Sequence, residues 1–132
     1  MSTDGTTSPE NAVNTMAMAV LNAIQNPVVM VDEGGFIIFA NWEAEAFFGA
    51  SAAHLSRYRI STFIPFGSPL LSLVDQVRER IAPVNEYRVD IGTPRNGGER
   101  IVDIYASPVQ EGHGSVVLVL QERTMTDKID RQ

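Results

Sequence analysis

The chain has 132 residues, of which 44% are apolar and 20% charged, and this composition suits one soluble globular domain with a real core. Its formal net charge of −6 argues against nucleic acid or an anionic membrane surface as the main partner, because both require a basic face. The sequence contains no cysteine, which excludes disulfides, thiolate catalysis, cysteine-ligated zinc and cysteine-linked chromophores.

The N-terminal segment, residues 1–9, is rich in Ser, Thr and Gly and is predicted to be disordered. It has neither the positive charge nor the apolar core of a signal peptide. The sequence also lacks any run of about 18 apolar residues, the length that a membrane-spanning helix requires. We therefore expect a cytoplasmic protein with no membrane partner.

Residues 10–25 are predicted to form an amphipathic helix, which ends at Asn26 because the residue before a proline is disfavoured in the helical conformation. Apolar residues recur along it at steps of three and four, at Val13, Ala17, Val20, Leu21 and Ile24. This stripe either packs on its own domain or forms a dimer interface. Its nearly heptad spacing favours the second interpretation, a homodimer formed through the helix.

Residues 27–41 are predicted to form a tight β-hairpin, because two short apolar runs flank an acidic, glycine-containing turn at residues 32–35. The two carboxylates of this turn also suggest a metal loop. However, no further carboxylates follow at the spacing of a calcium loop, so the turn is interpreted as geometry alone and no metal site is expected. Asn41 is then a good N-cap for a short helix that ends at Gly49.

Weak periodicity over residues 51–67 is typical of short helical turns that wrap a pocket. A longer helix over residues 68–82 follows, with Ser68 as its N-cap. After it, three strands are predicted over residues 84–92, 99–107 and 115–121.

Two of the predicted strands, 28–31 and 115–121, are apolar on both faces. Strands of this kind lie in the middle of a sheet that is covered on both sides, whereas alternating strands have one wet face. These two strands are therefore predicted to be central neighbours, with the helix 10–25 covering the second face of the sheet.

This order of elements resembles that of a PAS domain. Residues Asp32–Asn41 are similar to the family's D-x-x-G-x-I-x-x-x-N opening, and residues Glu43–Gly49 to its first helix, N-x-x-A-x-x-L-x-G. Residues Leu120–Thr124, followed by Asp127-Lys128, resemble the exit strand and the start of a signalling helix.

The resemblance implies an α+β fold, with a five-stranded antiparallel sheet of spatial order 2-1-5-4-3. Short helices are expected on one face of this sheet and the amphipathic N-terminal helix on the other. The PAS domain itself is then expected to span residues 26–123, and residues 124–132 to begin a signalling linker.

Among PAS domains, the chain is most similar to the N-terminal sensor part of NtrB-type nitrogen-regulation histidine kinases. The similar residues are Leu21–Ile24, Pro27–Asp32, Ala40-Asn41 and Ala44–Phe48. This resemblance implies the regulatory and dimerisation domain of a two-component sensor, which is not itself an enzyme. The implied partners are a downstream histidine kinase domain in the longer protein and the response regulator that this domain phosphorylates.

No cofactor is expected. Haem-binding PAS domains hold iron on a histidine of the long helix or nearby, but the helix 68–82 has none, and the chain's histidines are His54 and His113. The flavin photoreceptors of the family need a cysteine. No catalytic residue is expected either, because no Ser/His/Asp arrangement or phosphate-binding glycine loop is visible.

Noncovalent binding of a small ligand is not excluded by these residues. The alternative function is therefore that of a small-molecule or cofactor-binding sensor in another signalling protein. The candidates for lining its pocket are Phe47, Phe48, Phe63, Leu73, Val77, Tyr87, Ile104 and Leu118. The simpler interpretation is that these residues form a filled core. In either case, the candidates for passing a signal to the exit segment are Gln121, Arg123 and Asp127.

Overall fold

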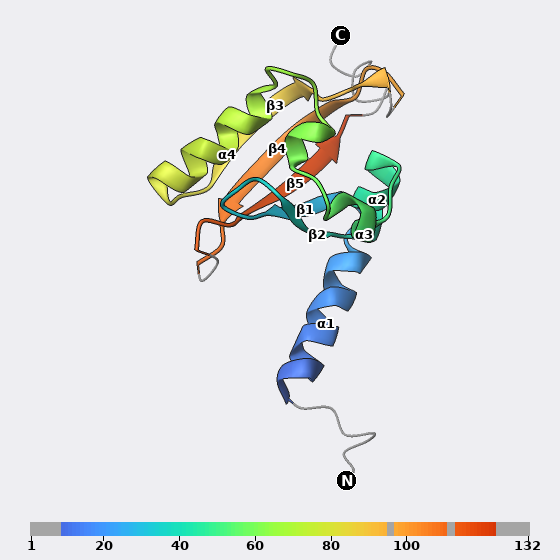
Figure 1. The fold of residues 1–132 in the computed structure, drawn as a ribbon, viewed down its shortest axis with the longest axis vertical. Coiled ribbons are helices and arrows are strands. Elements are labelled where there is room, and N and C mark those ends of the chain that lie inside the picture. The colour runs from blue at the N-terminus through green and yellow to red at the C-terminus, as the bar shows by residue number, and fades with distance from the viewer. Residues whose placement is uncertain (1–8, 95–96, 111–112, 124–132) are drawn as a thin grey trace.

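A computed structural model of the chain describes residues 9–94, 97–110 and 113–123 (Figure 1). The elements in order are α1 (Pro9–Ala23), β1 (Val28–Val31), β2 (Ile37–Ala40), α2 (Trp42–Phe48), α3 (Ala52–Leu55), the 3₁₀ turn η1 (Ile60–Thr62), α4 (Pro69–Arg80), β3 (Val84–Asp90), β4 (Ile101–Pro108) and β5 (Val116–Glu122). The segment predicted to be disordered, apart from Pro9, and the predicted linker 124–132 lie outside the described residues.

The five strands form one antiparallel sheet of order β2-β1-β5-β4-β3, so the predicted strand order is confirmed. Strands β1 and β5 are the central pair, with Val29 opposite Leu118 in the register. Neither of these side chains is exposed to solvent. The first and last strands of the domain therefore lie side by side in its centre, as their apolar composition predicts.

The core lies between the inner face of the sheet and the helices α2 to α4, which cover that face (Figure 1). Helix α4 begins as predicted, because the Ser68 hydroxyl accepts a hydrogen bond of 3.2 Å from the amide of Leu70. Its buried side is formed by Leu70, Leu73, Val74 and Val77, which recur at helical spacing and pack into the same core as the strands.

The opposite, outer face of the sheet carries half-buried apolar side chains. Met30 lies opposite Phe39 on β2 and opposite Val117 on β5, and Val28 lies opposite Val119. Residues paired across antiparallel strands point to the same side of the sheet, so these side chains share one face. We call the set Met30, Phe39, Val117 and Val119 the outer apolar face.

Helix α1 does not cover the outer apolar face, and this corrects the expectation drawn from the sequence. It projects away from the sheet (Figure 1), and the side chains of residues 15–20 are exposed. The physical reason lies at its C-terminal end, where the side-chain nitrogen of Asn41 donates hydrogen bonds to the carbonyls of Leu21 and Asn26, at 2.9 and 3.0 Å. These bonds hold the end of α1 beside the start of α2, and from there the helix leads away from its own sheet.

Candidate functional site

Seven of the eight predicted pocket residues are packed in the core. Each is at most 4% exposed, and all belong to one contiguous apolar cluster: Phe47, Phe48, Phe63, Leu73, Val77, Ile104 and Leu118. They come from α2, α4, β4, β5 and the residue after η1, so the structure brings together side chains that are far apart in the sequence. Side chains packed in this way fill the space between the helices and the sheet.

Tyr87, the eighth candidate, lies outside this cluster and is 64% exposed, so its assignment to the interior is wrong. The register of β3 against β4 shifts between Glu86 and Val89, where Arg88 adopts a positive φ of 58°. A bulge of this kind breaks the alternation of a strand, and Val89 rather than Tyr87 enters the core. The alternation of residues along the strand gives no sign of the bulge.

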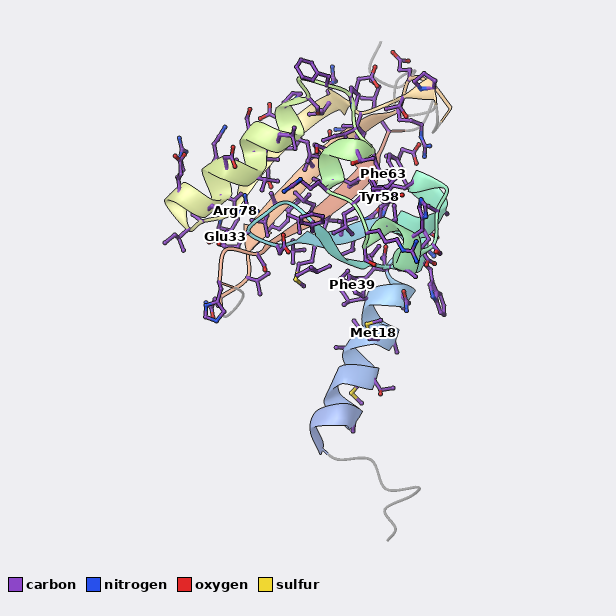
Figure 2. The ribbon with its side chains drawn as sticks, in the orientation of Figure 1. Met18, Glu33, Phe39, Tyr58, Phe63 and Arg78 are labelled. Atoms are coloured by element: carbon purple, nitrogen blue, oxygen red, sulfur yellow. The ribbon has the colours of Figure 1, made fainter. Side chains whose placement is uncertain are left out.

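An aromatic row crosses the helical layer. The ring centroids of Phe47 and Phe48 are 5.0 Å apart, those of Phe48 and Phe63 are 6.0 Å apart, and those of Phe63 and Tyr58 are 5.8 Å apart. Figure 2 shows Tyr58 and Phe63 close together in this layer. The row thus runs from exposed Tyr58 to buried Phe47 on α2, at distances typical of edge-to-face contact.

The candidate exit residues lie at the end of β5. The guanidinium of Arg123 pairs with the carboxylate of Asp103 on β4 at 2.5 Å, and its amide donates a hydrogen bond to the carbonyl of Ile101. Gln121 is exposed on the same strand, whereas Asp127 lies outside the described residues. The structure therefore places two of the three candidates together where the described chain leaves the sheet.

The sequence analysis missed Arg100, which precedes β4 and touches two elements at once. Its guanidinium carbon lies 4.1 Å from the centre of the Phe47 ring, and its Nε donates a hydrogen bond of 2.5 Å to Glu122 at the end of β5. In the sequence, the residue resembles any charged side chain at the end of a hairpin. The sheet register pairs Glu122 with Val102, and this pairing brings Arg100, two residues before Val102, within reach of Glu122.

A cleft of about 330 Å³ opens at the rim of the domain, between the β1–β2 turn and α4. Buried apolar side chains form its floor, and its mouth carries charges of both signs: Glu33, Arg59, Asp75 and Arg78. Figure 2 shows Glu33 and Arg78 close together there. Arg78 also joins three elements, because its guanidinium donates to the carbonyl of Asp32 and, at 2.8 Å, to that of Gly114.

The predicted turn at residues 32–35 has the expected geometry. The Asp32 carboxylate accepts a hydrogen bond of 2.9 Å from the amide of Phe36, and Gly35 supplies a positive φ of 88°. Among the described residues, no group of three His, Cys, Asp or Glu side chains could hold a metal ion. The same residues include no helix long and apolar enough to cross a membrane.

The candidate dimer residues follow one side of α1. Ala17, Val20 and Ile24 are exposed, and Leu21 is half-buried. The side chain of Val13 lies outside the described part of the chain. The exposed Met16 extends the same apolar side, and no residue between positions 11 and 26 carries a charge. The helix therefore presents an uncharged apolar surface to solvent.

Comparison with known families and proteins identifies the architecture. The family description of the PAS fold matches residues 16–123. The chain is 65% identical over 130 residues to the sensory histidine kinase/phosphatase NtrB of Rhizobium meliloti (strain 1021), covering 98% of this chain and 34% of that protein. It is 35% identical over 111 residues to the NtrB of Azospirillum brasilense, covering 84% of this chain and 28% of that protein. The chain thus spans about a third of the length of these relatives.

Among solved structures, the fold is similar to that of the PAS domain of nitrogen regulation protein NR(II) from Vibrio parahaemolyticus. The TM-score is 0.71 at 20% identity, and the match covers 82% of this chain and 98% of that one. A PAS domain from a two-component sensor histidine kinase matches with a TM-score of 0.66 at 11% identity, covering 86% of this chain and 99% of that one. At these identities the likeness concerns the fold alone.

Proposed function

The chain belongs to the PAS family, and from this premise we propose that it is the regulatory domain of an NtrB-type sensor histidine kinase in the cytoplasm. The observation that carries the proposal is the 65% identity to an NtrB protein over nearly the whole chain. In this proposal a downstream kinase domain phosphorylates a response regulator in nitrogen regulation. The domain described here contributes no catalytic group and changes the output of that kinase.

Labelling with radioactive ATP tests this division of labour. The purified longer protein and the purified chain of residues 1–132 are each incubated with the labelled nucleotide. We expect the longer protein to become labelled and to pass its label to a response regulator, whereas the chain of residues 1–132 stays unlabelled. Label on the short chain, or none on the longer protein, would contradict the proposal.

We further propose that the domain acts as a homodimer in which α1 takes part. The support comes from α1 itself, a helix of 15 residues on which Val20 is 59% exposed, and none of the described strands or helices packs against this side of it. A lone helix of this length is marginally stable in water, and most helical stability comes from packing of an apolar side. The lack of basic residues on α1 makes an anionic membrane a poor alternative partner.

The outer apolar face is a second apolar surface that a dimer can cover. Met30, Phe39, Val117 and Val119 are half-buried, and α1 of their own chain leads away from them. Covering an exposed Val or Met side chain stabilises an interface by roughly 1.5–3 kcal/mol at full burial. In the proposed dimer, α1 of one copy therefore packs either along α1 of the other copy or over the outer apolar face of its sheet.

Light scattering of the chain distinguishes a dimer from a monomer of 14.5 kDa. The variant Val20→Glu places a charge in the exposed apolar stripe, and we expect it to be monomeric. Thr15→Glu is the matched control, because Thr15 lies on the opposite side of the same helix, and this variant should stay dimeric. A parent chain that is monomeric at all concentrations, or two variants with the same oligomeric state, would contradict the dimer proposal.

The alternative function is that of a small-molecule sensor, and the rim cleft of about 330 Å³ between the β1–β2 turn and α4 is the observation in its favour. Because the predicted pocket residues pack against one another, we propose that the interior holds no resident cofactor. Native mass spectrometry and the absorbance spectrum of the purified protein test this. A retained mass or a visible absorbance band would favour the sensor, and their absence would favour the dimerisation and transmission module.

A further inference from the structure

Arg100 is placed to connect the helical layer with the end of the sheet. Its guanidinium lies over the ring of Phe47, 4.1 Å from the ring centre, and Phe47 belongs to α2. The same guanidinium donates a hydrogen bond of 2.5 Å to the carboxylate of Glu122, the last residue of β5. One planar group thus has an aromatic partner on one element and an anionic partner on another.

These two contacts depend on each other. A cation over an aromatic ring and a charge-assisted hydrogen bond both require a particular position of the guanidinium, which is rigid and planar. The side chain of Arg100 is 23% exposed and that of Glu122 is 43% exposed, so the guanidinium is largely covered whereas its anionic partner faces solvent. A movement of the Phe47 ring therefore changes the position from which Arg100 reaches Glu122.

Phe47 in turn is the buried end of the aromatic row. Phe48 lies against it at 5.0 Å, and Phe63 and Tyr58 continue the row towards the surface. Protein interiors are close-packed and transmit strain, and rings in contact leave one another little free space. A disturbance at the exposed Tyr58 end therefore reaches the ring on which Arg100 rests.

The end of β5 is also the place where the chain enters and leaves the domain. The amide of Leu120 donates a hydrogen bond of 3.0 Å to the carbonyl of Pro27, in the connection between α1 and β1. A groove of about 340 Å³ lies at this junction, and Pro27, Phe47, Arg100 and Glu122 are among the residues that line it. The Arg100–Glu122 pair thus borders both the segment from α1 and the exit strand.

We propose that Arg100 is the coupling residue of this domain. A shift of α2 makes or breaks its bond to Glu122, and the bond in turn holds or frees the end of β5. The inference deepens the proposed function, because it rests on the exit strand being the route to a downstream domain. Arg100 acts by position alone. It determines how well ordered the last residues of the sheet are.

The chain offers a matched control for this proposal. Arg123, the residue after β5, and Asp103 on β4 form a second ion pair of 2.5 Å, at the same end of the sheet as Arg100 and Glu122. This second pair has no aromatic partner on α2 among the described ring contacts. Removing it weakens the β4–β5 end without touching the proposed connection to α2.

Amide hydrogen exchange of the chain of residues 1–132 tests the coupling in one direction. Glu122→Gln should speed exchange at the α2 amides of Phe47 and Phe48 by about threefold or more, which is in the range of coupling effects between packed sites. Asp103→Asn should leave these amides unchanged. Urea denaturation of each variant establishes that it is folded and corrects the exchange rates for its global stability.

The opposite direction follows from the reciprocity of coupling. Phe47→Leu should speed exchange at the amides of Glu122 and Arg123, and the effect should disappear when Arg100→Gln is also present. Tyr58→Leu changes the exposed end of the aromatic row and creates no cavity in the core, and it should have the same effect on these amides. Equal effects with and without Arg100, or equal effects of Glu122→Gln and Asp103→Asn on α2, would overturn the proposal. Amide exchange is measured without a kinase, so a negative result here would contradict the coupling role of Arg100 and leave the proposed function unaffected. The ATP-labelling experiment tests the proposed function separately.

Discussion

At the scale of single residues, Asn41 does more than begin a helix. It is fully buried, and its side-chain oxygen accepts hydrogen bonds of 2.9 Å from the amides of Val28 and Ala44. Its side-chain nitrogen donates to the carbonyls of Leu21 and Asn26. The side-chain amide group thus uses all its hydrogen-bonding capacity on backbone groups of α1, the α1–β1 connection, β1 and α2. These bonds set the direction in which α1 leaves the domain.

Replacing this side chain should therefore be costly. Asn41→Ala leaves two buried amides and two carbonyls without their partner, and we expect a loss of about 3 kcal/mol in the free energy of unfolding, measured by urea denaturation. Asn22→Ala is the control, because Asn22 accepts a single exposed hydrogen bond, from the amide of Trp42. If both variants lose the same free energy of unfolding, the buried hydrogen bonds of Asn41 stabilise the fold no more than the single exposed one of Asn22.

Ile81 is a residue whose conformation conflicts with its type. It caps α4 in the left-handed region, at φ 51° and ψ 47°, and its side chain is 77% exposed. A branched side chain is disfavoured there, and glycine is the common residue at such caps. Ile81→Gly should therefore raise the free energy of unfolding by about 1 kcal/mol.

The control for this variant is Glu79→Gly, two residues earlier and inside the helix. There glycine loses backbone entropy without relieving any strain, and it should lower the free energy of unfolding by about 1 kcal/mol. The two substitutions introduce the same residue into the same helix end. If both lower the stability, the left-handed cap is not strained.

At the scale of elements, Arg78 holds α4 against two turns. It donates to the carbonyl of Asp32 in the β1–β2 turn and to that of Gly114 before β5, and it lies 3.5 Å from the carboxylate of Asp75. A lysine cannot present two donors in a fixed fork. We expect Arg78→Lys to cost about 1–2 kcal/mol in the free energy of unfolding and to speed amide exchange in both turns.

Arg80→Lys provides the comparison, because Arg80 is exposed at the end of the same helix. Surface substitutions of this kind change stability by no more than about 0.5 kcal/mol. An Arg78→Lys variant as stable as Arg80→Lys, with unchanged exchange in the turns, would mean that α4 is held by its apolar side alone.

The elements also show which parts of the structure the sequence could predict. The pairing of β1 with β5 followed from apolar residues on both faces of each strand, and the starts of α2 and α4 followed from Asn41 and Ser68. These are local or composition-based signals. The central strand pair and the helix caps therefore agree with the prediction from the residues, whereas the full strand order was implied by the resemblance to PAS domains.

Features that depend on contacts between distant segments were not predictable in the same way. The bulge that turns Tyr87 outwards results from a register shift between β3 and β4. The direction of α1 depends on the hydrogen bonds that Asn41 makes to Leu21 and Asn26, 20 and 15 residues away in the sequence. Arg100 meets Phe47 and Glu122 only in the folded chain. A single sequence carries no signal for these long-range partners.

At the scale of the whole molecule, the account assigns one task to each surface. The buried core joins the sheet to the helices α2 to α4. In the proposed function, α1 and the outer apolar face provide the contact with a second copy, and the end of β5 leads towards the kinase part of a longer protein. A dimer of PAS domains would place two exit strands in one assembly. Rearrangement at the dimer contact would then change both exits together.

The most direct test of the central claim uses the longer protein, because regulation is a property of the domain joined to its kinase. The quantity to measure is the steady-state fraction of protein that carries labelled phosphate from ATP, with residues 1–132 present and with residues 1–132 removed. We expect both forms to become labelled, with labelled fractions that differ several-fold. Equal fractions in two folded proteins would contradict the claim that this domain regulates the kinase.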